Sequence, residues 1–299
     1  LQEVTAIAAG DQSTCALDRA TAVHCWGANS VGQLSTGDIE PQLEPTATNL
    51  TEVTGLAIGR NTGYGLASSN YFAWGDNRAG QYGHHRVVYH TRNYPLGTLE
   101  GALGVAAGMA HACIWTEAGT VTCLGYNAQG QLGSGAVSGV EAAVVVGLQN
   151  VAGATAGDYH SCAWTNTGAV ACWGSNNFRQ LGDPDISNSL VPRFVQDIAD
   201  VTAVSAGGLH NCARQDGGAI LCWGANAHGQ LGDGSNNDRA QPEAVADLPV
   251  ALSVASGIEH SCAIFADATV RCWGRNRFGQ LGTGDIINRN KPSLVTEMR

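Results

Sequence analysis

The sequence predicts an all-β protein, a six-bladed β-propeller of four-stranded antiparallel blades. Three observations carry this prediction: one motif occurs six times, short strand-like segments lie between turn residues, and cysteine pairs repeat with the motif. One glycine fixes the register of each copy, at steps of 49, 49, 49, 50 and 50 residues. A period near fifty residues that fills the chain is typical of repeat architectures. We therefore expect a single domain over residues 1–299. The register glycines are Gly10, Gly59, Gly108, Gly157, Gly207 and Gly257.

Each copy contains four short strand candidates, as the first copy illustrates. Residues 4–10 (VTAIAAG), 14–18 (TCALD) and 22–27 (AVHCWG) are rich in small, β-branched and aromatic residues. A fourth candidate, residues 43–48 (LEPTAT), follows a polar loop. Apolar residues do not recur at helical spacing over any long window, and 40 glycines and 8 prolines supply many turns. Four antiparallel strands per copy, repeated radially, form a β-propeller.

All ten cysteines fall into five pairs with nine residues between the partners. If the second and third strands form a hairpin, Cys113 and Cys123 lie opposite each other about a turn at Ala118. Opposed residues have Cβ atoms about 4.5–5.5 Å apart, close to the separation that a disulfide requires. We predict five hairpin disulfides, against the alternative of five pairs of buried thiols, and hence an oxidising compartment. The predicted bridges join Cys15 to Cys25, Cys113 to Cys123, Cys162 to Cys172, Cys212 to Cys222, and Cys262 to Cys272.

The second copy and the chain ends depart from the regular pattern. The second copy has Tyr64 and Ala73 at the cysteine positions, so we expect packing to replace the bridge there. We also expect the segment Val4–Ala8 to complete the last blade beside residues 293–297, since this would cover an exposed edge. The chain begins at Leu1, which we interpret as a mature form or an excised domain.

The composition limits the classes of partner. The chain is 44% hydrophobic and has a formal net charge of −10, which disfavours binding to nucleic acid or to anionic membranes. No apolar run approaches the roughly 18–20 residues that span a bilayer. Residues 271–299 are an exception to the acidic character, with six basic residues against two acidic ones. A solvated face and a site for an acidic partner both remain open interpretations of that stretch.

The repeat resembles that of the regulator of chromosome condensation family. The resemblance rests on the patterns AAGxxHSCA and GxVxCWGxNxxGQLG, and it covers nearly the whole chain. In the first copy the matching residues include Trp26, Gly27, Asn29, Gln33 and Leu34. Further matches are Gly32, Trp173, Gly174, Asn176, Gln180, Leu181, Gly182, Trp223, Gly224, Asn226, Gly229, Gln230, Leu231 and Gly232. The third copy has Leu124 in place of the tryptophan.

The resemblance implies a β-propeller that serves as a scaffold for protein contacts. The best-known members have seven blades, whereas this chain has six copies of the motif. The cysteine pairs are absent from the nuclear members and look like those of secreted bacterial relatives, so the nucleotide-exchange activity of the nuclear founder is a poor guide. One secreted bacterial branch inhibits β-lactamases through one propeller face and is the nearer functional analogue, although its contact residues do not transfer individually.

Four histidines recur two residues before the first cysteine of a pair. We expect them near the start of the second strand, at the rim of a central channel, where they bond to backbone. The alternative is a metal site, because neutral imidazole binds zinc, copper or nickel, but blade-to-blade separation argues against four ligands reaching one ion. We predict no metal and no cofactor. These channel-rim candidates are His111, His160, His210 and His260.

Two groups of residues are candidates for partner binding. The residues before the recurring histidines vary in chemistry and include Asp158, Tyr159 and Glu259. A constant frame with variable loop tips is typical of a binding surface, and simple surface drift is the alternative. The second group lies between residues 78 and 94, where Arg and Tyr, common at interface hot spots, are abundant. A locally repacked blade and a histidine metal site are the alternatives there. This group contains Arg78, Tyr82, His84, His85, Arg86, Tyr89, His90, Arg92 and Tyr94.

Signals for catalysis are weak. The sequence lacks a G-x-S-x-G elbow, an H-E-x-x-H motif and a P-loop. The run Asp233 to Asp238 (DGSNND) faintly resembles a calcium loop, and we interpret it as a turn. We predict a secreted or cell-surface, non-catalytic propeller that binds another protein or copies of itself, without nucleic acid or membrane insertion. The alternatives are a structural subunit of an extracellular assembly, a carbohydrate-binding propeller, and a hydrolase or lyase acting over the channel.

Overall fold

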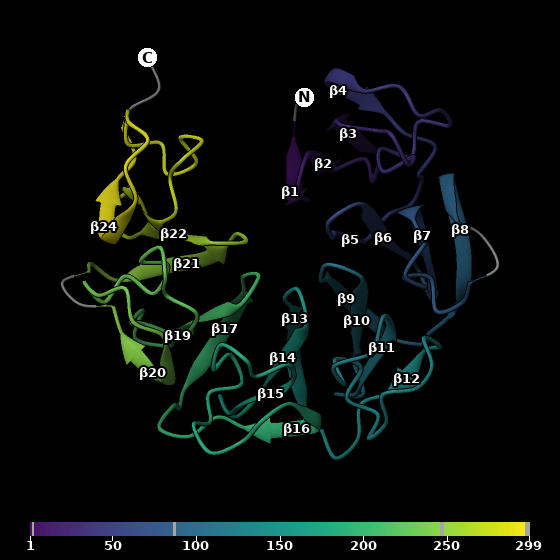
Figure 1. Cartoon of the computed structure of the whole chain (residues 1–299). Coiled ribbons are helices and arrows are strands. Elements are labelled where there is room, and N and C mark those ends of the chain that lie inside the picture. The colour runs from purple at the N-terminus through teal and green to yellow at the C-terminus, as the bar shows by residue number, and fades with distance from the viewer. Residues whose placement is uncertain (2, 86–87, 246–247, 297–299) are drawn as a thin grey trace. The chain divides into compact units, whose positions relative to one another are not determined.

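The protein consists of six four-stranded antiparallel sheets. The computed structural model describes residues 1, 3–85, 88–245 and 248–296, and no helix occurs in these ranges. The four strands of each sheet follow one another in chain order (Figure 1). The predicted fold class, a six-bladed β-propeller, is therefore confirmed. Within the described ranges no helix has the length and apolar character needed to cross a bilayer.

The six sheets, numbered as blades 1 to 6, have the following strands. Blades 1 to 3 contain β1 (Val4–Ala9), β2 (Ser13–Asp18), β3 (Val23–Gly27), β4 (Gln42–Ala47), β5 (Gly55–Ile58), β6 (Thr62–Ala67), β7 (Asn70–Asp76), β8 (Tyr89–Thr98), β9 (Ala102–Ala107), β10 (His111–Thr116), β11 (Val121–Gly125) and β12 (Ala143–Val144). Blades 4 to 6 contain β13 (Val151–Ala156), β14 (His160–Thr165), β15 (Val170–Gly174), β16 (Ser189–Phe194), β17 (Val201–Ala206), β18 (His210–Gln215), β19 (Ile220–Gly224), β20 (Arg239–Ala244), β21 (Ala251–Ser256), β22 (His260–Phe265), β23 (Val270–Gly274) and β24 (Arg289–Leu294).

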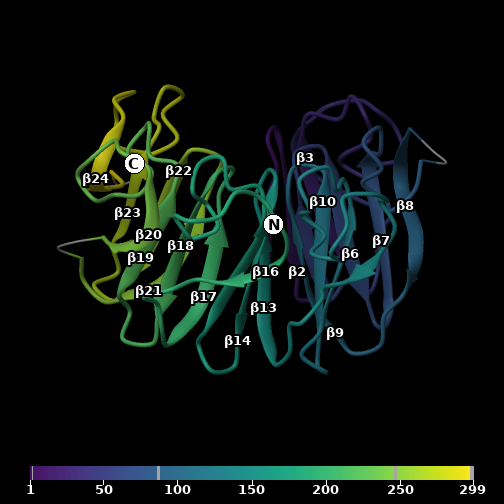
Figure 2. The ribbon, with the colours of Figure 1, turned by 60° about the horizontal axis from the view of Figure 1, so that its bottom comes forward.

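The chain divides into two compact units. Unit 1 comprises Leu1–Ala128 and Leu132–Ala154, and unit 2 comprises Gln129–Gln131 and Thr155–Arg299. Unit 1 thus holds blades 1 to 3 and unit 2 holds blades 4 to 6, except that β13 begins in unit 1 and that residues 129–131, in the loop after β11 of blade 3, belong to unit 2. Within each blade, loops join the strands at both ends of the sheet (Figure 2).

The predicted disulfide hairpins are present in five blades. In blade 3, β10 pairs with β11 so that Cys113 lies opposite Cys123. The turn of this hairpin closes where Gly119 N donates to Thr116 O at 2.9 Å. Gly119 has a φ of +72°, a conformation that glycine adopts without steric cost.

All ten cysteines are bridged within their own blade, as predicted. The Cα atoms of the bridged pairs are 4.1–4.2 Å apart. The alternative of buried thiols is therefore wrong. The bridges join Cys15 to Cys25, Cys113 to Cys123, Cys162 to Cys172, Cys212 to Cys222, and Cys262 to Cys272.

Packing replaces the bridge in blade 2, as the sequence predicted. Tyr64 lies opposite Ala73 in the β6–β7 pair, and both side chains are buried. The Tyr64 hydroxyl donates to Gln81 O at 3.0 Å. The large ring thus fills the space beside the small alanine, and its polar atom is satisfied inside the blade.

The expectation that Val4–Ala8 completes the last blade is wrong. β1 pairs with β2 in blade 1, and blade 6 takes its four strands, β21 to β24, from the last copy of the motif. The physical reason is loop-closure entropy, because pairing across a short turn orders far less chain than pairing the two ends. Each copy of the repeat therefore builds one complete blade.

Within each unit, the hydrophobic core lies between successive blades. Leu34 and Val23 of blade 1 belong to one buried cluster with Trp74 of blade 2. Likewise Leu231 of blade 5 belongs to a buried cluster with Trp273 of blade 6. Because such a blade covers its apolar face with the next blade, a single copy of the repeat cannot bury its own core.

Candidate functional site

The asparagine and glutamine of the WGxNxxGQL motif fold the loop that follows the third strand. In blade 4, Asn176 Oδ1 accepts from Leu181 N and Gln180 Oε1 accepts from Phe178 N, both at 2.9 Å. The same pair of bonds occurs in every blade, so these two motif positions are structural. The other pairs are Asn29 and Gln33, Asn77 and Gln81, Asn127 and Gln131, Asn226 and Gln230, and Asn276 and Gln280.

The motif tryptophan fastens this loop to the next blade. Trp223 Nε1 of blade 5 donates to Gln180 O of blade 4 at 3.0 Å. Trp74 and Trp173 make the equivalent bonds to Gln33 O and Gln131 O, both at 2.9 Å. These tryptophans have no exposed surface. They hold blades together and offer no face on which a sugar ring could stack.

The recurring histidines lie at the start of the second strands, as predicted, with His111, His160 and His210 fully buried. The expected bond to backbone is wrong for two of them. His160 Nε2 contacts Asn211 Oδ1 of the next blade at 2.9 Å, and His210 Nε2 contacts Ser261 Oγ at 2.8 Å. Sequence reasoning missed these contacts because the partner residue differs from blade to blade.

The donor in these contacts follows from the partners. Asn211 Nδ2 donates to Gln180 O at 2.8 Å, so its Oδ1 faces His160 and must accept. Ser261 Oγ donates to Gln230 O at 3.0 Å, so it accepts from His210. Each imidazole therefore carries its proton on Nε2 and is neutral. A side chain at the register glycine would collide with the ring, since a Cβ at Gly157 would lie 2.2 Å from His160 Cε1.

Burial keeps these imidazoles uncharged. It lowers the pKa of His160 from 6.5 to about 4. Burial, together with the neighbouring imidazoles of His260 and His160, lowers the pKa of His210 to about 3. Burial also lowers the pKa of His260. In the described part of the chain, no three His, Cys, Asp or Glu side chains are placed to hold a metal ion.

The variable tips before the histidines lie at the same end of each blade as the motif loop. Ser175 N, in the WGSN segment, donates to Tyr159 O at 2.8 Å, and Arg275 N donates to Glu259 O in the same way. The Glu259 carboxylate bonds the Arg275 guanidinium and lies 3.4 Å from His228 Nε2 of blade 5. Asp158 and Tyr159 are half-buried. The role of these three tips in binding stays a prediction.

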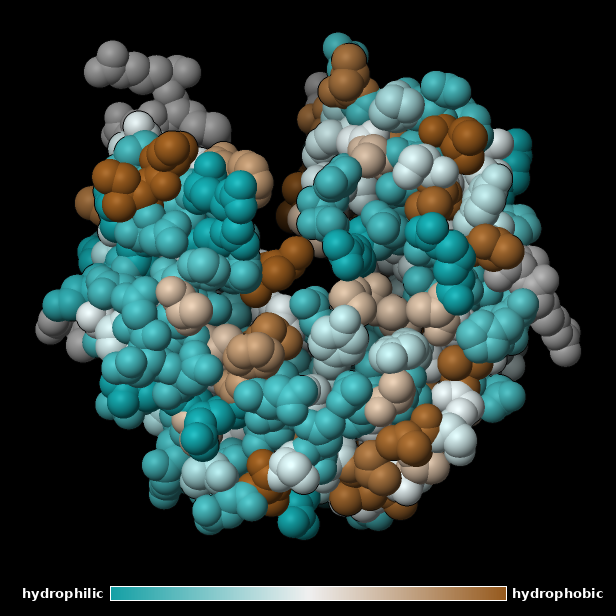
Figure 3. Space-filling model, viewed as in Figure 1, coloured by the Kyte–Doolittle hydropathy of each residue, from teal (hydrophilic) through white to brown (hydrophobic). Residues whose placement is uncertain are grey.

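Exposed apolar side chains stand on the motif loops of unit 2. Phe178 and Phe278 occupy the same position, two residues after the motif asparagine, and are 43% and 78% exposed. Ile258, at the tip beside Glu259, is 48% exposed. The Arg277 guanidinium lies 4.8 Å from the centroid of the Phe278 ring. On the face drawn in Figure 3, hydrophobic residues form separate patches within a hydrophilic surface.

Sequence reasoning did not single out Phe178 and Phe278. The signal was available, because this position is variable between two constant residues of the motif. It is occupied by Val31, Ala79, Gln129, Phe178, His228 and Phe278.

Part of the stretch between residues 78 and 94 forms an aromatic cluster in blade 2. The Tyr94 ring lies 5.6 Å from Tyr82, 5.2 Å from His84 and 5.3 Å from His90, measured between centroids. Tyr82 is buried, its hydroxyl donates to Gly75 O at 2.7 Å, and burial raises its pKa. These four residues therefore pack against one another, as a locally repacked blade would.

The remaining predicted residues of this stretch lie at the surface. Arg78 pairs with Asp76, through Nε and Nη2 at 2.9 and 2.8 Å. Arg92 lies over the loop of blade 1, where a Cβ at Gly37 would be 2.9 Å from its Nη2. His85 and Tyr89 are exposed. Arg86 lies outside the described residues. Partner binding by these side chains stays a prediction.

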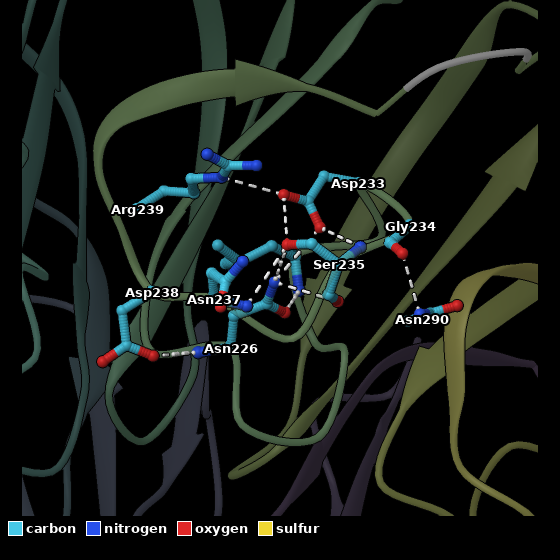
Figure 4. Close-up of polar contacts among 9 residues, drawn as sticks. Asn226, Asp233, Gly234, Ser235, Asn237, Asp238, Arg239 and Asn290 are labelled. Carbon is cyan, nitrogen blue, oxygen red and sulfur yellow. Dashed lines mark hydrogen bonds and ion pairs between the residues drawn. The ribbon is translucent and has the colours of Figure 1, made fainter.

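The run from Asp233 to Asp238 is a turn, as interpreted from the sequence (Figure 4). Asp233 Oδ2 accepts from Arg239 Nε and from Ser235 Oγ, both at 2.9 Å. Its Oδ1 accepts from Ser235 N, and Asp238 Oδ1 accepts from Asn226 N, both at 2.8 Å. Both carboxylates are thus used by the loop itself and do not converge on a cation.

Three of the six basic residues in the stretch 271–299 form ion pairs. Arg271 contacts Asp267, Arg275 contacts Glu259, and Arg289 contacts Asp285. Asp267 and Glu259 lie outside residues 271–299, so their pairs offset two of the four excess positive charges of that stretch.

Two family models match the chain. Both describe the regulator of chromosome condensation (RCC1) repeat. One matches residues 167–214, 217–264 and 267–299, and the other matches residues 4–33, 151–180, 201–230 and 252–280.

Similar proteins are known by sequence and by structure. The probable E3 ubiquitin-protein ligase HERC6 of Homo sapiens is 31% identical over 141 residues, or 44% of this chain, and the match spans 14% of that protein's length. Human WBSCR16 is similar over 99% of this chain and 82% of its own, with a TM-score of 0.89 and 24% identity. Prp20p of Saccharomyces cerevisiae is similar over 98% and 77%, with a TM-score of 0.86 and 22% identity. At these identities the structural likeness concerns the fold, and together with the repeat matches it places this chain in the RCC1 repeat family.

Proposed function

We propose that this chain is a non-catalytic, protein-binding propeller of an oxidising, extracellular compartment. One observation carries the proposal: the constant Asn and Gln of the motif fold the loop, the constant Trp joins it to the next blade, and a variable position on the same loop presents Phe178 and Phe278 to solvent. Exposed aromatic residues on a rigid scaffold are typical of protein interfaces, because they bury a large area at low entropic cost. The five disulfides support the oxidising compartment.

The relatives support a protein partner. The crystal structure of Prp20p is described with binding to Gsp1p and histones, and yeast Prp20 is also known bound to Kap60. From these relatives we infer that the chain associates with other proteins. We do not infer that it binds the same partners. The carbohydrate-binding alternative has less support, because four of the seven tryptophans have no exposed surface.

The proposal predicts that the exposed phenylalanines dominate binding. The double variant with Phe178→Ser and Phe278→Ser should weaken association with the partner about thirtyfold, the usual size of a hot-spot loss. The partner is first captured from the extracellular fraction of the source organism with the immobilised wild-type protein. Its affinity for each variant is then measured by interferometry.

The matched control combines Leu43→Ser with Leu294→Ser, which removes two exposed leucines from the fourth strands of blades 1 and 6. This variant should bind like the wild type and have a similar melting temperature. Equal affinity of the phenylalanine and leucine variants would refute the proposed face. A protein that captures nothing above background would refute the proposed function.

A further inference from the structure

A polar pocket lies in unit 2 between the loop after β19 and strand β24. Its volume is about 370 Å³, and only polar residues line it, including Asn236 of blade 5 and Asn288, Arg289 and Lys291 of blade 6. Most small-molecule sites are lined by apolar and aromatic side chains. A pocket without apolar side chains is instead suited to a polar or charged group.

Hydrogen bonds within the chain join the two walls of the pocket. Gly234 N donates to Asn290 O, and Asn290 Nδ2 donates back to Gly234 O, both at 2.8 Å. The loop that carries Gly234 is braced by Arg239 and Ser235 on Asp233 (Figure 4). A site that needs no ordering on binding keeps more of its interaction energy as affinity.

One cation in the pocket has no counter-charge among the described residues. The Arg289 guanidinium pairs with Asp285, and His228, which also lines the pocket, contacts Glu259. Lys291 has no carboxylate oxygen within 4.0 Å among the described residues. Its stem packs over Gly234, where a Cβ would lie 2.9 Å from Lys291 Cε. Lys291 is exposed, and its charge is uncompensated among the described residues.

The fold does not require a cation at this position. The third residue of the fourth strand is Glu44 in blade 1, Val191 in blade 4 and Gln241 in blade 5. Lys291 is also the single lysine of the chain, whose net charge is −10. A lone uncompensated lysine in an acidic protein is thus a local feature of this pocket.

We propose that this pocket binds a carboxylate side chain, Asp or Glu, from an extended segment of a protein partner. The single uncompensated charge matches a monoanion, whereas a phosphate group carries close to two negative charges. Asn288 lines the pocket and has its Oδ1 engaged by Asn276 N, so its Nδ2 is the atom that could donate to such a ligand. That the carboxylate belongs to a natural protein partner rests on the function proposed above.

The single lysine allows the pocket to be observed directly. In protein prepared as residues 1–299, reductive methylation with ¹³C-formaldehyde labels only Lys291 and the terminal amine of Leu1, and it keeps the positive charge. We expect hexaglutamate, acetylated and amidated at its ends, to shift the Lys291 dimethyl resonance saturably while the Leu1 resonance stays in place. The same concentration of hexaglutamine should shift neither resonance.

The variant Ser293→Asp places a carboxylate of the chain itself in the pocket lining. It should weaken hexaglutamate binding at least about tenfold, because like charges repel at short range. The control Leu294→Asp adds the same charge at the exposed neighbouring residue, outside the pocket lining, and should bind like the wild type. Melting curves of both variants check that the fold is intact.

Several outcomes would overturn the proposal. Parallel shifts of the Lys291 and Leu1 resonances would show nonspecific attraction, and equal binding by both aspartate variants would place the peptide elsewhere. Displacement of hexaglutamate by an equal concentration of inorganic phosphate would show a general anion site. Because the probe is synthetic, the assay is independent of the phenylalanine experiment, so failure of either proposal can be recognised without the other.

Discussion

The buried histidines couple the stability of the fold to pH. His160 and His210 are neutral, and each donates its Nε2 proton to a side chain of the following blade. Neither imidazole has a hydrogen-bond partner at Nδ1 among the described residues. Protonation of that nitrogen would place a charge in the core without an acceptor, which costs several kcal/mol.

Stability should therefore fall when the pH is lowered below about 6.5, the ordinary pKa of histidine. Below pH 6.5 these two imidazoles bind a proton in the unfolded chain but not in the folded chain. This difference ends when the pH reaches the folded pKa, which is about 4 for His160 and about 3 for His210. Each imidazole should lower the free energy of unfolding by up to about 1.4 kcal/mol per pH unit in this range. Urea unfolding at pH values between 7 and 4 measures the slope.

The double variant with His160→Gln and His210→Gln is the control for this slope. Glutamine can still donate a hydrogen bond but does not titrate, so the variant should lose less stability between pH 6.5 and 4 even if it is less stable at pH 7. Carboxylates titrate in both proteins and cancel in the comparison. Identical pH slopes would refute the assignment to these two histidines.

At the scale of the element, the motif loop of one blade and the motif tryptophan of the following blade form one structural unit. The loop presents the backbone oxygen of its glutamine, and the following blade inserts an indole beneath it. Blade 6 differs, because Trp273 Nε1 is buried without a hydrogen-bond partner in the described part of the chain. Comparing a tryptophan that makes this bond with Trp273, which does not, separates the contribution of the hydrogen bond to stability from that of packing.

Replacement of a tryptophan by phenylalanine should cost more in blade 5 than in blade 6. Trp223→Phe removes packing and the bond to Gln180 O, whereas Trp273→Phe removes packing and relieves an unpaired buried donor. The difference in the free energy of unfolding should be about 1 kcal/mol or more, the net value of one hydrogen bond. Denaturant midpoints of the two variants, measured side by side, check it. A more destabilising Trp273→Phe would contradict the role of the bond.

At the scale of the whole molecule, the five disulfides decide where the fold can persist. Each closes a loop of about ten residues, which should contribute roughly 2–3 kcal/mol. Intact mass after alkylation should show no addition to the native protein and ten additions after reduction under denaturing conditions. Reduction should also lower the melting temperature. Alkylation of native cysteines would refute both the bridges and the oxidising compartment.

The candidate site was predictable only in part. The variable tips at Asp158, Tyr159 and Glu259 and the stretch from residue 78 to residue 94 stood out by their composition. The structure shows that Tyr82 and Tyr94 pack inside blade 2 and that Glu259 is engaged by Arg275. Composition does not reveal whether an aromatic residue is buried or exposed, because aromatic side chains are suited both to core packing and to partner binding.

The repeat, the strands, the hairpin disulfides and the all-β class could all be predicted from the amino-acid sequence. These features are local, because a strand, a turn or a hairpin disulfide depends mainly on residues that are near in the sequence. The six copies of the motif repeat the same local pattern, which makes it easy to recognise. The partners of the buried histidines, the exposure of Phe278 and the lack of a counter-charge near Lys291 among the described residues became known only from the folded structure. These properties depend on residues one blade away, and burial and charge pairing there are settled only when successive blades pack.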